Sequence, residues 1–166
     1  DEDISQIAVE DSRLALGKLG AAWRQQLSPV VIGITGSNGK TTLKELTAAC
    51  LATTAPTLAT HGNLNNDIGM PLMLTRIEDR HRFAVIEMGA NHVGEIAYLT
   101  ALAKPDIVVI TNAGAAHLEG FGSLDGVARG ERLATFVQMQ TAIRRGKSIR
   151  QVGPEHHEST GQVKAS

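Results

Sequence analysis

The chain has 166 residues, a length that fits one ordinary domain with a sizeable hydrophobic core. Hydrophobic residues make up 42% of the sequence but aromatic residues only 3%, so the core must be built from aliphatic side chains, as in buried parallel sheets. The formal net charge of −1 gives no global attraction to nucleic acid or to an anionic membrane. We therefore expect neither partner, and any phosphate binding must be local.

The cysteine content and the absence of a long apolar run predict a protein of the reducing cytoplasm. Cys50 is the single cysteine, so it cannot form an internal disulfide, and we expect it to be a buried small residue in a reducing compartment. No run approaches membrane-spanning length, and the acidic start Asp1-Glu2-Asp3 is not a signal peptide. The expectation is a cytoplasmic protein, not inserted in a membrane and monomeric.

Four apolar runs with β propensity follow one another along the chain, at residues 30–35, 57–60, 83–88 and 107–111. The stretches between them have helical spacing, so the fold class is α/β, a parallel sheet with helices on both faces. After the first run, an apolar helical stripe is predicted at Leu43, Leu46, Thr47, Cys50 and Leu51. A second helix is predicted over residues 93–103, with its stripe at Ile96, Leu99, Thr100 and Ala103, and it should end before Lys104-Pro105.

The segment between the first run and the first predicted helix has the features of a phosphate-binding loop. Glycines at 36 and 39 allow a tight turn close to phosphate oxygens, and backbone N–H groups together with the helix N-terminus supply partial positive charge. Lys40 would add a cation at the β- and γ-phosphates, and Thr41 a hydroxyl for magnesium. The alternative is a glycine-rich turn with an exposed lysine. The predicted nucleotide-binding residues are Gly36, Ser37, Asn38, Gly39, Lys40, Thr41 and Thr42.

Polar residues follow the other three runs, and the carboxyl ends of parallel strands meet at one edge of a sheet. Asn63, Asn65 and Asn66 lie between two glycines, where amides can hold an anion without adding charge, although a plain asparagine-rich turn is the alternative. Glu87 ends an apolar strand and is a candidate magnesium ligand; the alternative is an exposed loop acid. His117 is a weaker candidate, since a lone loop histidine is more often structural.

These residues together resemble the Mur ligase family of ATP-dependent amide-forming enzymes. The shortened loop Thr35-Gly36-Ser37-Asn38-Gly39-Lys40-Thr41 carries the resemblance. Three further segments sharpen it toward the family member that extends a UDP-linked tripeptide: residues 62–69, residues 87–96 and residues 112–123, which includes Ala115-Ala116-His117. The related folylpolyglutamate synthases share the phosphate loop but are not expected to have these segments.

The resemblance implies a reaction, its cofactors and its partners. ATP would transfer its γ-phosphoryl group to the terminal carboxylate of UDP-N-acetylmuramoyl-tripeptide, and the amine of D-Ala-D-Ala would attack the acyl phosphate. It further implies that Lys40 binds the β- and γ-phosphates and that Thr41, Glu87 and His117 hold Mg²⁺. Asn63, Asn65 and Asn66 would border the transfer site, beside Lys40 and His117.

The resemblance also implies a domain division. Residues 27–129 correspond to the ATP-binding central domain, residues 1–26 to a remnant of an N-terminal domain and its linker, and residues 130–166 to a tail outside the family, with one helix and then disorder. The family's lysine that supports a second metal is missing after Arg129, where Gly130-Glu131-Arg132 follows. We therefore expect a fragment, with a shifted reading frame or a fusion as the hypothesis for the tail. The alternatives are a non-catalytic nucleotide-binding domain and an unrelated phosphate-loop kinase or ATPase.

Overall fold

The computed structural model describes residues 5–92 and 94–111. The predictions for His117, for the break after Arg129 and for the tail lie outside these residues. The elements, in chain order, are α1 (Ser12–Gln25), β1 (Val30–Thr35), α2 (Lys40–Ala52), β2 (Thr57–Ala59), α3 (Gly69–Leu74), β3 (Phe83–Glu87), α4 (Glu95–Ala103) and β4 (Ile107–Ile110).

The four strands form one parallel sheet in the order β2-β3-β1-β4. All four apolar runs of the sequence are strands, and the α/β class is confirmed. The register places Ile34 beside Glu87 and Thr35 beside Ile110. The phosphate loop therefore leaves the sheet between the ends of β3 and β4.

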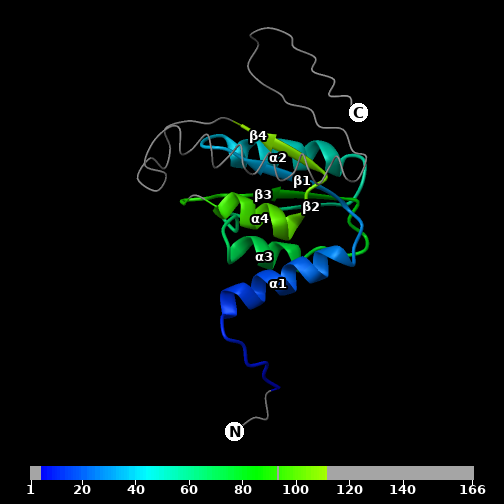
Figure 1. Ribbon diagram of the computed structural model, residues 1–166. Coiled ribbons are helices and arrows are strands. Elements are labelled where there is room, and N and C mark those ends of the chain that lie inside the picture. The colour runs from blue at the N-terminus through cyan, green and yellow to red at the C-terminus, as the bar shows by residue number, and fades with distance from the viewer. Residues whose placement is uncertain (1–4, 93, 112–166) are drawn as a thin grey trace, which may run out of the picture.

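Helices cover both faces of the sheet, as predicted (Figure 1). Successive side chains of a strand point to opposite faces, so Val31 packs on one face, against α3 and α4, and Ile32 and Ile34 pack on the other, against α2. The larger core lies under α3 and α4 and contains Val31, Met70, Leu74, Ile77, Ala84, Ile86, Met88, Ile96, Leu99, Leu102 and Ala103.

The buried face of α2 matches only part of the predicted stripe. Leu46 is 61% exposed, and Cys50 is exposed rather than buried. These residues are four apart and therefore share one helix face, which here faces solvent. Leu43 and Leu51 of the predicted stripe do pack against the sheet, together with Ala48, and Lys44 is fully buried. The predicted stripe did not include Lys44, whose burial rotates the buried face away from Leu46 and Cys50.

The first helix forms an outer layer against α3 and α4 (Figure 1). Asp11 caps it by accepting hydrogen bonds from the backbone N–H groups of Arg13 and Leu14 at 2.8 and 2.9 Å. A Cβ at Gly20 would lie 2.8 Å from the carbonyl oxygen of Pro71, so glycine permits the close approach of α1 to α3. The domain boundary near residue 26 stays a prediction.

A buried arginine joins α1 to the segment that precedes β4. Arg24 donates to the carbonyl oxygens of Ala103 and Lys104 at 3.2 and 3.5 Å, and its guanidinium lies 3.8 Å from Asp106 Oδ2. The same carboxylate oxygen accepts from the backbone N–H of Val31 at 2.9 Å. Asp106 thus ties the start of the central strand to the α1 layer.

We predict that Asp106→Ala destabilises the fold by about 3 kcal/mol, because it removes the carboxylate beside a buried guanidinium and leaves the Val31 N–H without its acceptor. Urea unfolding followed by circular dichroism measures this change. Asp79→Ala, in an exposed loop, serves as the matched control and should shift stability by less than about 0.5 kcal/mol. Equal effects of the two substitutions would contradict the role given to Asp106.

Candidate nucleotide and magnesium site

The loop between β1 and α2 has the backbone that phosphate binding requires. Gly36 and Gly39 adopt φ angles of 125° and 78°, values that other residues rarely tolerate. The helix α2 then begins at Lys40, so its first backbone N–H groups face the loop with no partner inside the helix. This arrangement attracts an anion.

The Lys40 side chain folds back over this loop. Its Nζ donates to the carbonyl oxygens of Gly36 at 2.6 Å and Ser37 at 3.2 Å. The ammonium group therefore lies over the loop itself, where a bound phosphate chain would also lie. A phosphate oxygen would be a stronger acceptor than a neutral carbonyl.

The end of β4 supports the same loop. The hydroxyl of Thr111 donates to the carbonyl oxygen of Asn38 at 2.6 Å, and its backbone N–H donates to the carbonyl oxygen of Thr35 at 2.9 Å. Thr111 thus holds the loop at Thr35 and at Asn38.

Glu87 is a buried carboxylate at the end of β3, with 2% of its surface exposed. Its Oε1 accepts from Asn65 Nδ2 at 2.8 Å and from the Thr41 hydroxyl at 3.3 Å. Its Oε2 is also buried and has no hydrogen-bond partner among the described residues. A buried carboxylate oxygen without a donor is costly, and a cation bound beside it would remove that cost.

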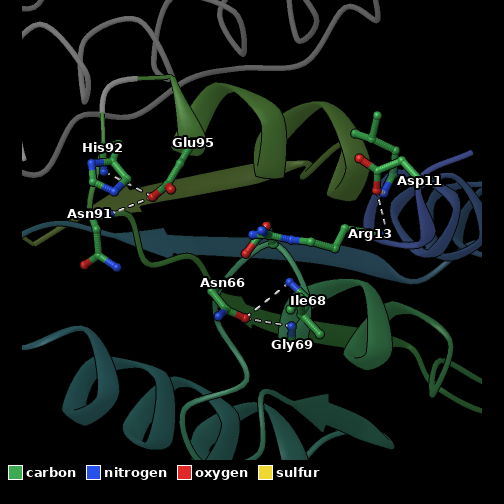
Figure 2. A network of polar contacts seen from close by, with 10 residues as sticks. Asp11, Arg13, Asn66, Ile68, Gly69, Asn91, His92 and Glu95 are labelled. Carbon is green, nitrogen blue, oxygen red and sulfur yellow. Dashed lines mark hydrogen bonds and ion pairs between the residues drawn. The ribbon is translucent and has the colours of Figure 1, made fainter.

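The asparagine loop contributes unequally to this arrangement. The Asn65 side chain contacts Glu87, and the backbone carbonyl oxygen of Asn65 accepts from the backbone N–H of Gly89 at 2.8 Å. Asn66 instead turns its Oδ1 to the backbone N–H groups of Ile68 and Gly69, at 3.3 and 2.8 Å (Figure 2). Asn66 therefore supports the start of α3, whereas Asn65, like Thr41, contacts the Glu87 carboxylate.

Three predicted site residues, Thr41, Asn65 and Glu87, are brought together from three different segments. Lys40 lies one residue before Thr41, and Asn63 and Thr42, like Thr41, are exposed. Within the parts of the chain that the structure covers, no three His, Cys, Asp or Glu side chains form a cluster that could hold a metal ion. Any cation here would rely on one carboxylate, a hydroxyl and other ligands, a pattern that suits Mg²⁺.

Comparison with known proteins gives this arrangement a family. Residues 34–142 match the Mur ligase middle domain. The chain belongs to the Mur ligase family. It is 54% identical over 129 residues to the UDP-N-acetylmuramoyl-tripeptide–D-alanyl-D-alanine ligase of Escherichia coli, a match that covers 78% of this chain and 28% of the relative.

Solved Mur ligase structures have the same fold. A MurF structure from Acinetobacter baumannii superposes with a TM-score of 0.79 at 41% identity, covering 92% of this chain and 38% of that one. MurF ligase from Thermotoga maritima in complex with ADP gives a TM-score of 0.74 at 28% identity, covering 91% and 39%. The chain thus spans well under half the length of the relatives that it matches.

Two buried residues of this Mur ligase chain were not predicted. Lys44 is fully buried in α2 and donates to the carbonyl oxygen of Thr60 at 2.8 Å, and Thr60 is itself 2% exposed. A signal was present, since Lys44, Ala48 and Leu51 have the spacing of one helix face. A charged residue inside an apolar stripe indicates a buried partner.

A separate cleft of about 360 Å³ lies where α1, the asparagine loop and the start of α4 meet. Arg13 and Asp67 form an ion pair at its edge, and the Glu95 carboxylate accepts from the backbone N–H groups of Asn91 and His92 at 2.7 and 3.2 Å (Figure 2). Burial raises the pKa of the Tyr98 phenol that lines this cleft, and the nearby carboxylate of Asp67 raises it further.

Among the described residues, no helix has the length and apolarity needed to cross a membrane.

Proposed function

We propose that this chain is the ATP-binding module of a ligase that joins D-Ala-D-Ala to UDP-N-acetylmuramoyl-tripeptide. The relatives that carry this ligase name support the proposal, as does the solved neighbour in complex with ADP. The reaction belongs in the cytoplasm, where ATP is supplied. The observation that carries the nucleotide part is the Glu87 carboxylate, which is buried at the end of β3, contacts Thr41 and has one oxygen unpaired among the described residues.

The residues at this edge fit a magnesium ion. Mg²⁺ prefers oxygen ligands and keeps several waters while one or two carboxylates and the nucleotide phosphates complete its shell. Glu87 Oε2 and the Thr41 hydroxyl are the described groups that would hold it, and Thr41 would exchange its contact with Glu87 Oε1 for the ion. When bound, the ion neutralises charge on the phosphates during transfer.

The chain's own groups would do the remaining electrostatic work. Phosphoryl transfer to a carboxylate brings two anions together, so catalysis depends on positioning and on charge neutralisation. The Lys40 ammonium would leave the carbonyl oxygens of Gly36 and Ser37 for the β- and γ-phosphates, and the N-terminus of α2 would face the same anion. The acyl phosphate made in this way is activated because inorganic phosphate is a far better leaving group than hydroxide.

Roles for the remaining predicted residues follow from their places. Asn65 would hold Glu87 Oε1 so that Oε2 is free for the ion, and Asn63 would border the transfer site. Asn66, whose Oδ1 is used by the start of α3, would shape the loop. His117 would be a second metal ligand; this role comes from the family resemblance alone.

A second candidate function is nucleotide binding without ligation. The observation in its favour is that the described site groups, Lys40, Thr41 and Glu87, would contact nucleotide and metal ion. Mixing the chain with ATP, Mg²⁺, UDP-N-acetylmuramoyl-tripeptide and D-Ala-D-Ala separates the two. ATP-dependent amide product supports the ligase, whereas binding of nucleotide with no product supports the second candidate. Absence of both contradicts each of them.

We predict that Lys40→Ala weakens magnesium–ADP binding by about 10- to 100-fold, the value of a charge-assisted contact of roughly 1.5–3 kcal/mol. Isothermal titration calorimetry measures the affinity. Lys18→Ala, an exposed lysine on α1, is the matched control and should bind like the unmodified chain. Equal affinities for all three proteins would exclude Lys40 from the phosphate site.

We predict that Glu87→Gln raises the Mg²⁺ concentration needed for half-maximal nucleotide binding by about 10-fold or more, since the amide cannot replace an anionic ligand. The melting temperature of the nucleotide-free protein should stay the same or rise, because the substitution removes a buried charge. Titrating Mg²⁺ at fixed ADP measures the first effect, with Asp79→Asn as the charge-matched control. A large loss of thermal stability with an unchanged Mg²⁺ requirement would show that Glu87 is structural.

A further inference from the structure

Lys44 is the most deeply buried charged side chain among the described residues, and the function proposed above does not use it. It lies one helical turn beyond Lys40 in α2 and has none of its surface exposed. Its Nζ donates to the carbonyl oxygen of Thr60 at 2.8 Å and lies 2.7 Å from Glu45 Oε1. The Glu45 side chain is 66% exposed, so solvent screens that ion pair and Thr60 is the buried partner.

Thr60 connects this lysine to the end of β3. Its hydroxyl accepts from the backbone N–H of Glu87 at 2.9 Å, and its own N–H donates to the carbonyl oxygen of Val85 at 2.9 Å. Thr60 follows β2 directly and precedes the asparagine loop. A single residue therefore fixes the Lys44 amine, the backbone of Glu87 and the start of the loop that carries Asn65.

The helix α2 contacts the Glu87 region at two points. Thr41 and Lys44 are three residues apart and lie on one face of the helix. Thr41 donates to the Glu87 carboxylate directly, and Lys44 reaches the Glu87 backbone through Thr60. The distance between the Thr41 hydroxyl and the Glu87 carboxylate therefore depends on both contacts.

This distance matters because a magnesium ion would have to contact both oxygens. Mg²⁺ requires nearly ideal octahedral geometry, with ligand distances of about 2.0–2.1 Å, so it tolerates little displacement of α2 relative to β3. A lysine used only to fill the core would be costly there, since an aliphatic residue fills the same space without desolvating a charge.

We propose that Lys44 is a positioning residue for magnesium binding: through Thr60 it holds α2 and β3 at the separation that lets Thr41 and Glu87 share one ion. This inference rests on the function proposed above. Lys44 itself touches neither the nucleotide nor the metal. The contact with Thr60 predicts that removing the amine changes the response to Mg²⁺ more than the affinity for metal-free nucleotide.

The test compares Lys44→Met and Thr60→Val with the unmodified chain. Methionine keeps the length of the lysine side chain without its charge, and valine keeps the shape of threonine without the hydroxyl that Glu87 contacts. We expect each substitution to raise the half-saturating Mg²⁺ concentration for ADP binding by about 10-fold, as removal of a residue that orients a metal ligand commonly does. Binding of ADP in EDTA should change by less than about 2-fold, because the phosphate loop is untouched.

Two controls separate positioning from general loss of stability. Ile77→Val removes one methylene from the core on the other face of the sheet and should lower the melting temperature while leaving the Mg²⁺ requirement unchanged. Glu45→Ala removes the exposed ion pair of Lys44 but keeps its contact with Thr60, so it should also bind Mg²⁺ and ADP normally. All measurements are made below the melting temperature of the least stable variant.

The outcomes are distinct. Folded variants with an unchanged Mg²⁺ requirement, or with equal losses in Mg²⁺ and in EDTA, overturn the proposal. If Lys44→Met does not fold, Thr60→Val decides, and failure of both to fold assigns these contacts to core stability and also overturns it. If the unmodified chain binds no magnesium–ADP, the proposed function fails together with the inference. Normal binding by the unmodified chain with unaffected variants overturns the inference alone.

Discussion

Burial of the Glu87 carboxylate is the constraint around which the described site is organised. Moving a carboxylate out of water costs several kcal/mol unless its oxygens are paired. Here an amide and a hydroxyl pair Oε1, a threonine hydroxyl accepts from the backbone N–H, and Oε2 has no donor among the described residues. The protein thus keeps one buried carboxylate oxygen without a donor among the described residues, close to Thr41 at the start of α2, and a cation bound there would remove the cost.

The parallel sheet explains how residues from distant segments form the candidate nucleotide and magnesium site. Parallel pairing brings the ends of β1 and β3 to one edge, with Ile34 beside Glu87, so the phosphate loop and the carboxylate meet without long connections. The end of β4 holds the loop from the other side through Thr111. Because the chain carries a formal net charge of only −1, attraction for nucleotide must come from these local groups and not from a general field.

Much of the fold and part of the site could be predicted from the sequence. The strands could be predicted because each is a short aliphatic run. Glycines at 36 and 39 indicated a tight turn that needs positive φ angles, and the structure confirms these angles. The pairing of Glu87 with Asn65 could only be anticipated as a shared sheet edge, since a sequence does not show which of three asparagines reaches the carboxylate. Asn66 has the same chemistry, but its Oδ1 contacts the backbone of α3.

The errors in α2 have one physical origin, which is that the spacing of apolar residues does not show whether a charged residue of the same helix is buried. Leu46 and Cys50 were predicted to be buried, whereas the structure exposes both and buries Lys44. Lys44 can be buried because Thr60, sixteen residues away, contributes a carbonyl acceptor for its ammonium group. Helical periodicity does not identify that acceptor. The packing of α1 likewise depends on a tertiary contact, that of Arg24 with Asp106.

A crystal structure of this chain with magnesium and ADP would test the central claim most directly. The account predicts the nucleotide phosphates against residues 36–41, the Lys40 ammonium moved from the Gly36 carbonyl oxygen to a phosphate, and Mg²⁺ within about 2.0–2.1 Å of oxygens of Thr41 and Glu87 or one water away. Nucleotide bound elsewhere, or bound at this loop with the ion remote from Glu87, would contradict the account.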